Sequence, residues 1–290
     1  MNTKLLEVGI DWLTATCPLG DVRQDEYDAI YRRLSVEYIK HGYVVKPMRR
    51  LGYTGETING LFIGTSPQGT LIQASGTSAE HLAMSFKYAQ HTPHLTRIDV
   101  QTTVQLEEIH DHAALQFDKT EDYKALQPKG KRWKAIHIHS AQDGCTANIG
   151  SRTSPMFIRI YDKSAQSPLG GYPPNSWRFE LELKQELANR FFQGYLEATN
   201  ERDYLLGVLT TAAERRGLVV VWPYTFVEID FAAPRTKTDD EKKLDWLRSH
   251  VRSTVSLLIY RGLEYEVINA LGLDGIVDEK YTSDIEGTFE

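Results

Sequence analysis

The feature that most constrains how this chain folds is an internal repeat, in which similar short segments occur twice in the same order. Residues 98–103 (Ile-Asp-Val-Gln-Thr-Thr) are similar to residues 10–15 (Ile-Asp-Trp-Leu-Thr-Ala), and residues 149–155 are similar to residues 63–67 around an Ile-Gly pair. From the aspartate to the glycine, the two copies span 53 and 51 positions. Self-similarity at one period predicts a duplicated unit of strand, helix and hairpin, whose halves share one curved sheet about a pseudo-two-fold axis.

The first half, at about residues 8–90, shows its elements in the spacing of apolar residues. Residues 8–16 alternate between apolar and polar, which predicts a strand. Residues 25–41 carry apolar side chains at helical spacing and precede Gly42, so they predict a helix. Residues 43–75 are short segments separated by glycines, as in a hairpin or meander, and residues 79–89 predict a second helix.

The second half, at about residues 96–197, is expected to repeat this order, with a hairpin at Asp143-Gly144, a strand ending at Lys184 and a helix after it. Residues 217–230 are β-branched and aromatic, which predicts a further strand. Polar residues then lead into helices on either side of Gly262. The sequence thus predicts an α+β fold: an antiparallel sheet with helices packed on one face, residues 1–234, and a C-terminal helical segment, residues 235–290.

Composition limits the classes of protein to which the chain can belong. With 290 residues, 41% of them hydrophobic, it can bury a large core. Cys17 and Cys145 lack metal-ligand spacing, and no apolar run is long enough for a membrane span or a signal peptide, so a cytoplasmic protein is expected. A net charge of −6 argues against non-specific coating of DNA. Two basic clusters are either DNA contacts or solvated loops: Lys46, Arg49 and Arg50, and Lys129, Lys131, Arg132 and Lys134.

The clearest chemical pattern is a tyrosine among cations, Tyr161. On a strand, Arg159, Tyr161 and Lys163 share one face, while Ile158 and Ile160 point into the core. A phenol has an ordinary pKa near 10, so it needs a base or a polarised phosphate before it attacks. We expect Tyr161 as nucleophile, with Arg159 and Lys163 holding the non-bridging phosphate oxygens.

Eleven residues beyond the repeated glycine, the first half has Ser75 where the second half has Tyr161. The chemistry is therefore expected in the second half only.

Three carboxylates are candidate ligands for a divalent metal. Asp99, with Glu180 or Glu182 from a facing strand, offers hard oxygen donors that suit Mg²⁺ or Mn²⁺. Alternatively, Asp99 pairs with Arg97, and the two glutamates pair with neighbouring cations.

Other residues are candidates for DNA contacts. Arg152 or Arg178 would add a bidentate phosphate clamp. Trp133 would stack on unpaired bases beside a basic cluster of Lys131, Arg132 and Lys134.

His137 and His139 form a histidine-hydrophobe-histidine element, 22 residues or so before Tyr161. Their imidazoles would emerge on one side of a strand. Either they bind a metal or they form a polar face beside the basic cluster.

Five segments together resemble a known family, the rolling-circle replication initiation factors of plasmids and phages, with the related relaxases of integrative conjugative elements. Those segments are residues 9–14, 96–99, 149–154, 159–163 and 178–182. The resemblance implies a sequence-specific endonuclease and ligase that nicks one strand at an origin and becomes linked to the 5′ phosphate through a tyrosine. The family's Tyr-x-Lys element falls on Tyr161.

The same resemblance implies partners and a fold. The expected partners are origin DNA, single-stranded or extruded as a hairpin, a helicase of the host, and a second copy of the chain. The fold it implies is a duplicated curved sheet of the TATA-binding-protein type.

Two other functions remain open at this point. The chain could be a non-catalytic DNA-binding protein with the same fold, or a histidine-dependent phosphoesterase. Substitution of Tyr161 or of His139 distinguishes them.

Overall fold

The protein consists of a large α+β unit and a small helical one. The computed structural model describes residues 3–106, 135–140, 144–216, 218, 222–223, 227, 229, 239–247 and 251–271. These residues divide into two compact units, Met1–Ala232 and Ala233–Glu290. The predicted fold class, an antiparallel sheet with helices and a C-terminal helical part, is confirmed.

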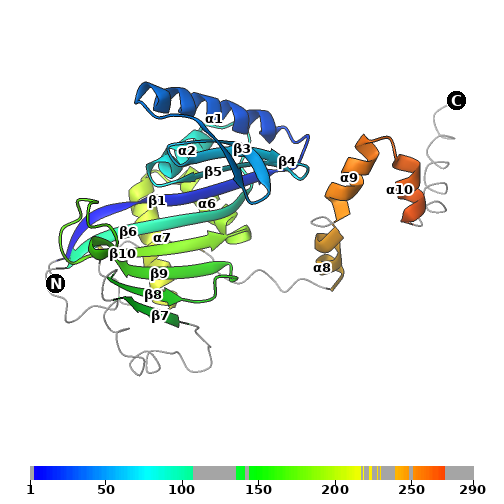
Figure 1. Ribbon diagram of the computed structural model, residues 1–290. Helices are drawn as coiled ribbons and strands as arrows, with labels where there is room; N and C mark the ends of the chain where they lie inside the picture. The colour runs from blue at the N-terminus through cyan, green and yellow to red at the C-terminus, as the bar shows by residue number, and fades with distance from the viewer. Residues whose placement is uncertain are drawn as a thin grey trace. The chain divides into compact units, whose positions relative to one another are not determined.

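One sheet of ten strands organises the first unit. Its order is β2-β3-β4-β5-β1-β6-β10-β9-β8-β7, and every neighbouring pair is antiparallel (Figure 1). The strands are β1 (Thr3–Cys17), β2 (Lys46–Arg50), β3 (Tyr53–Ile58), β4 (Leu61–Ser66), β5 (Gly69–Ser75), β6 (Leu95–Leu106), β7 (Ala135–Ser140), β8 (Gly144–Ile149), β9 (Met156–Asp162) and β10 (Ser176–Lys184).

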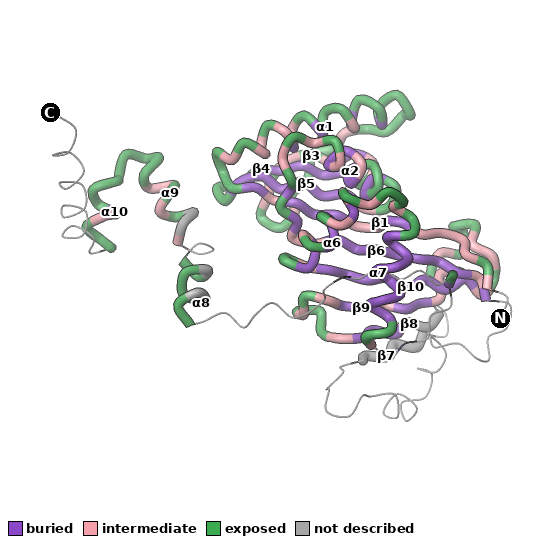
Figure 2. Tube along the Cα trace, turned by 180° about the vertical axis from the view of Figure 1, so that it is seen from behind, coloured by how far each residue is buried: buried purple, intermediate pink, exposed green. Residues whose placement is uncertain are grey.

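Helices of the described residues cover one face of this sheet. The helices are α1 (Arg23–Lys40), α2 (Thr77–Lys87), α5 (Lys163–Gln166), α6 (Glu186–Glu197) and α7 (Glu201–Arg215). Helices α1, α2, α6 and α7 pack against the central strands, and buried residues run along those strands (Figure 2). The core between the layers includes Leu13, Ile98, Leu181, Phe191 and Phe192.

Helix α7 was not predicted from the sequence. Ten consecutive residues, from Tyr204 to Ala213, are buried in it. A helix that is buried on every side has no polar stripe, so the period of 3.6 residues that reveals an amphipathic helix is absent.

The strand order reads the same from both ends of the sheet, because four strands lie on each side of the central β1–β6 pair. In this arrangement β5 leads into α2 and β10 leads into α6. Ser75 pairs with Trp12, and Lys184 pairs with Arg97. Trp12 thus corresponds in position to Arg97. Strand β9, which carries Tyr161, corresponds to β4. This differs from the sequence comparison, which set Asp11 against Asp99 and Ser75 on β5 against Tyr161. Common descent of the two halves stays a prediction.

The strand-to-helix junctions also match in their backbone. Gly76 has φ 58° and ψ −141°, and Gln185 has φ 52° and ψ −123°. The Gly76 N–H donates to the carbonyl of Asp11, and the Gln185 N–H donates to that of Thr96. The two halves therefore share a turn that favours glycine, and only the first has a glycine there.

The second unit contains α8 (Asp239–Trp246), α9 (Arg252–Tyr260) and α10 (Glu264–Ala270). Gly262 lies between α9 and α10 with a positive φ, as a helix stop requires. Among the described residues, no helix is long and apolar enough to cross a membrane. The predicted strand at 217–230 falls mostly outside the described residues.

Candidate functional site

The sheet face opposite α1, α2, α6 and α7, here called the polar face, carries ionisable residues in rows across four strands. Strand register sets β9, β10, β6 and β1 side by side, in that order. The first row is Tyr161, Arg178, Thr103 and Glu7; the second is Arg159, Glu180, Gln101 and Gly9; the third is Phe157, Glu182, Asp99 and Trp12; and the fourth begins with Lys184, Arg97 and Thr14. Alternation in the strands therefore gathers residues that lie far apart in sequence.

Tyr161 lies at the end of the first row, near the end of β9. It shares the polar face with Arg159, as predicted from alternation, while Ile158 and Ile160 belong to the core. The tyrosine is 7% exposed. Burial, and next the negative charge of Glu180, raise the pKa of the phenol well above its ordinary value. The free protein therefore holds the hydroxyl protonated.

Lys163 is not on the strand, in contrast to the prediction. β9 ends at Asp162, whose carboxylate accepts a hydrogen bond from the Ala165 N–H and caps the short helix α5. Lys163 is the first residue of that helix. Its ammonium still lies 5.8 Å from the centroid of the Tyr161 ring and 5.5 Å from that of Tyr172. Burial lowers the pKa of Lys163, and the charge of Arg178 lowers it further.

Arg178 is an internal hub and not an open DNA clamp. The residue is 3% exposed. Its guanidinium donates to Glu7 at 2.6 Å, to the Tyr172 hydroxyl at 2.9 Å and to Thr103 at 3.0 Å, and it lies 3.5 Å from Asp11. The bidentate contact of Arg178 with DNA stays a prediction, and it would require the guanidinium to leave these internal contacts.

Glu7, Asp11 and Tyr172 were missed by sequence reasoning. Glu7 and Asp11 come from β1, about 150 residues before Tyr161 in the chain. Only the strand order, which puts β1 two strands from β10, brings them to the site. The repeated aspartate was the one available signal, since Asp11 belongs to the first copy of the repeat.

Asp99 and Glu182 form a compact ion network with two cations. Arg97 donates to both oxygens of Asp99, at 2.8 and 2.5 Å, and lies 2.9 Å from Glu182. Lys184 lies 2.6 Å from the other oxygen of Glu182. Burial raises the pKa of Asp99 to about 7, against the opposing pull of Arg97. This geometry agrees with the alternative to a metal site, in which Asp99 pairs with Arg97 and the glutamates pair with neighbouring cations.

Arg159 and Glu180 form the second ion pair of this face. Arg159 donates to Glu180 and lies 3.9 Å from Asp99. The Nε of Arg159 is buried without a partner among the described residues. Glu180 is the one predicted metal ligand that also acts on Tyr161, because its charge contributes to the raised pKa of the phenol.

The predicted metal trio of Asp99, Glu180 and Glu182 does not meet as an open site. No group of three metal-binding side chains is found among the described residues. The oxygens of the trio point to guanidinium or ammonium groups instead. Their role as ligands would require Arg97, Arg159 and Lys184 to release them.

Several other predicted residues stand apart from the Tyr161 row. Arg152 is exposed in the β8–β9 loop, with its guanidinium 5.4 Å from the centroid of Phe157. Lys131, Arg132, Trp133 and Lys134 lie outside the described residues.

The two histidines belong to β7, and only their register is described. His137 pairs with Ala147, while Ile138 pairs with Thr146, the residue that pairs with Tyr161. By register, Ile138 continues the row of Tyr161.

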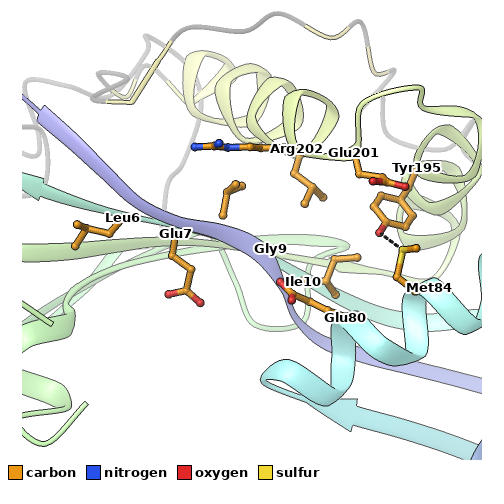
Figure 3. A pocket seen from close by; sticks show the side chains of 11 residues that line it. Leu6, Glu7, Gly9, Ile10, Glu80, Met84, Tyr195, Glu201 and Arg202 are labelled. Carbon is orange, nitrogen blue, oxygen red and sulfur yellow. Dashed lines mark hydrogen bonds between the residues drawn. The ribbon is translucent and has the colours of Figure 1, made fainter. Parts of the chain in front are cut away.

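A cleft of about 590 Å³ runs along β1 where β5 no longer pairs with it (Figure 3). It is lined by residues Leu6 to Ile10, with Glu80, Met84, Tyr195 and others from α2, α6 and α7. A Cβ at Gly9 would come within 1.9 Å of a Glu80 oxygen, so a larger residue there would displace the Glu80 side chain. Glu7 lines this cleft and also binds Arg178, but Tyr161 does not line it.

Comparison with known proteins gives two findings. A family model described as replication initiation factor matches residues 93–263. A solved structure, titled as that of a rolling circle replication initiator protein from Geobacillus stearothermophilus, is similar with a TM-score of 0.50 and 16% identity, and the match covers 86% of this chain and 96% of that one. At that identity the likeness shows the fold alone. No curated protein matches the chain.

Proposed function

The chain belongs to the replication initiation factor family, whose model matches more than half of it, and we propose that Tyr161 is its nucleophile for nicking origin DNA in rolling-circle replication. Site-specific nicking that starts replication is the general activity of such initiators. The observation that carries the residue assignment is the first row of the polar face. There Tyr161 pairs with Arg178, which in turn binds the carboxylates of Glu7 and Asp11, and the ammonium of Lys163 lies 5.8 Å from the centroid of the tyrosine ring.

In the proposed step, the Tyr161 hydroxyl gives its proton to solvent as its oxygen attacks the phosphorus of one phosphodiester. The P–O3′ bond breaks, the 3′ oxygen leaves and takes up a proton, and the 5′ phosphate stays bound to the tyrosine. Because the phosphotyrosine preserves a phosphodiester, the reverse attack by a 3′ hydroxyl rejoins the strand without a nucleotide cofactor.

Two cations are placed to act on the phosphate. Lys163 lies at the rim of the tyrosine ring, and Arg159 is two residues before Tyr161 on the same face. We assign both to the non-bridging oxygens, where positive charge stabilises the charge that develops in the transition state. Arg178 is a positioning residue, because its contacts hold Glu7, Asp11 and Tyr172 around the phenol.

Initiators of this type generally use a divalent metal, and the carboxylates nearest Tyr161 fit one. Burial raises the pKa of Asp11, and the charges of Glu180 and Glu7 raise it further. Such a site favours a cation. Mg²⁺ is commonly held by one or two carboxylates, with waters and substrate phosphate completing its shell. We assign Asp11 as the residue that would hold Mg²⁺ or Mn²⁺, joined by Glu180 where Arg159 releases it. The metal would polarise the phosphate when bound.

The test is to trap the covalent intermediate. Full-length protein is incubated with supercoiled DNA of its own origin and Mn²⁺ and then digested. A peptide that spans residue 161 and carries nucleotide is the expected product. Tyr161→Phe should abolish both the nick and the adduct, whereas Tyr88→Phe, at a tyrosine that is 76% exposed on the helical side, should keep both. Nicking by Tyr161→Phe at the wild-type rate would contradict the assignment.

The burial of Tyr161 favours one competing function, a DNA-binding protein without turnover. A ring that is 7% exposed must gain access to the phosphate when DNA binds. The same trapping experiment decides, because a binding-only protein gives no adduct with any origin DNA. The host helicase and a second copy of the chain remain proposed partners, and the division into a nicking domain, 1–234, and a helical segment, 235–290, remains a proposal about function.

A further inference from the structure

Four basic side chains, here called the cationic band, cross the polar face at the end away from Tyr161. They are Arg152 from the β8–β9 loop, Lys184 from β10, Arg97 from β6 and Arg50 from β2. Three of them rest on aromatic rings of the sheet. Arg50 and Arg97 each lie 4.9 Å from the centroid of Trp12, and Arg152 lies over Phe157.

The strands explain how side chains from both halves form one band. Lys184 pairs with Arg97 across β10 and β6, and its ammonium donates to the Arg152 carbonyl. Trp12 follows on β1, and beyond it the guanidinium of Arg50 reaches Gln73 on β5. Gln73 is itself buried. The band therefore extends from β9 to β5 without a gap in the sheet.

The ion network under the band has its charges in two layers. The side chains of Asp99 and Glu182 are 2% and 4% exposed, whereas those of Arg97 and Lys184 are 30% and 25% exposed. The acids thus lie beneath and orient the cations, and nitrogen atoms face outward. A surface of this kind attracts phosphate even where the numbers of acids and bases are equal.

Arg50 and Arg152 add charge that no acid offsets. Among the described residues, neither has a carboxylate partner, and both guanidiniums lie over rings instead. Arg152, stacked in this way, presents its N–H donors at the edge of the guanidinium, in the fork geometry that matches two phosphate oxygens, while Arg50 also contacts Gln73.

The band lies at a definite distance from the nucleophile. Phe157 is four residues before Tyr161 on the same strand, which corresponds to about 13 Å at the usual rise of a strand. A single strand of DNA would cover this separation with a few nucleotides at most. Resting on the proposed nicking function, we propose that the cationic band binds the phosphate backbone of the single-stranded DNA next to the nicked phosphodiester, without reading its bases.

The test measures binding of full-length protein to a labelled single strand of about 20 nucleotides, long enough to span such a site, across a series of NaCl concentrations. Two unrelated sequences serve as probes. Arg50→Gln and Arg152→Gln are the variants, because neither leaves a buried carboxylate unpaired. Arg33→Gln is the matched control, an exposed arginine on α1 over the helical face.

Each phosphate contact adds about 0.7 to the slope of log K against log salt for single strands. Arg50→Gln and Arg152→Gln should each lower that slope by about 0.7, and the double variant by about 1.4, equally for both sequences. Arg33→Gln should leave it unchanged. Variants at 50 and 152 that match Arg33→Gln, or that weaken only one of the two sequences, would overturn the proposal. Melting curves of each variant show whether it is folded.

The two proposals fail separately. If wild-type protein forms the Tyr161 adduct but the band variants bind like the control, the band is refuted and the nicking function stands. If the band variants lose slope while no adduct forms, the backbone contact stands and the nicking function is refuted.

Discussion

At the scale of single residues, the carboxylates of the polar face differ in how much of their surface is accessible. The side chain of Asp11 is 34% exposed and touches only one edge of Arg178, whereas that of Glu182 is 4% exposed and lies between Arg97 and Lys184. An ion that takes one or two carboxylates needs an accessible oxygen. Alternation alone places both residues on one face, so it cannot rank them, and the ranking comes from the neighbours that three other strands supply.

Asp11→Asn is predicted to weaken Mn²⁺ binding at least about tenfold, because it removes the accessible oxygen donor. Glu182→Gln should leave Mn²⁺ affinity within about twofold, although it removes a partner of Arg97 and lowers stability. Electron paramagnetic resonance of free Mn²⁺ in a titration of each protein measures both. Loss of Mn²⁺ binding in Glu182→Gln with retention in Asp11→Asn would restore the metal role expected from the sequence.

Tyr195 supplies a prediction on pH. It is buried on α6 and donates only weakly, to Met84 at 3.7 Å, and burial raises its pKa to about 12. Below pH 10 the phenol is neutral in both states. Between pH 10 and 12 the unfolded chain ionises first, so the free energy of unfolding falls as pH rises.

Tyr195→Phe should therefore recover roughly 1 kcal/mol of stability at pH 11 relative to wild type, and little at pH 8. Urea unfolding at both pH values measures the difference. Tyr88→Phe, at an exposed ring, is the control. An equal effect of Tyr195→Phe at the two pH values would show that the hydroxyl titrates alike in both states.

At the scale of elements, the junction between β10 and α6 holds a side chain in a backbone conformation that suits glycine. Gln185 has φ 52°, its corresponding position in the first half is Gly76, and the side chain is exposed. A residue with a Cβ in this region costs on the order of 1 kcal/mol or more.

Gln185→Gly is therefore predicted to raise the free energy of unfolding by roughly 1 kcal/mol, net of the entropy that glycine adds to the unfolded chain. Chemical denaturation of the variant measures it. Gln185→Ala keeps the Cβ and should give no gain. A gain of the same size in both variants would place its origin in the lost glutamine side chain and not in φ.

Elements were predictable from the sequence where one side faces water. Helices α1, α2 and α6 and the β2–β5 meander begin and end within a few residues of expectation, because periodicity reports a boundary between core and solvent. α7 has no such boundary. The site was predictable where it is local, as for Tyr161 and Arg159 on one strand. Arg178 and Asp11 depend on pairing between distant strands, and Lys163 depends on where β9 gives way to α5, which a one-residue shift decides.

At the scale of the whole molecule, charge is segregated. The chain has a net charge of −6, yet the outward layer of the polar face presents arginine and lysine. Overall acidity argues against uniform coating of DNA and is compatible with a confined binding face. The sheet supplies this face because α1, α2, α6 and α7 pack on the other one.

The two units also differ in what stabilises them. Nearly every buried apolar residue among those described belongs to the first unit, and Val267 is the one in the second. A core of that size does not depend on the helical segment, since the hydrophobic contribution follows the area buried.

A chain ending at residue 234 is thus predicted to melt within about 3 °C of the full-length protein, a shift of less than roughly 1 kcal/mol. It should still form the Tyr161 adduct with single-stranded origin DNA. Differential scanning calorimetry and the adduct assay measure the two properties, with Tyr161→Phe in the shortened chain as the negative control. A fall in melting temperature beyond about 10 °C would mean that residues 235–290 contribute to the core of the first unit.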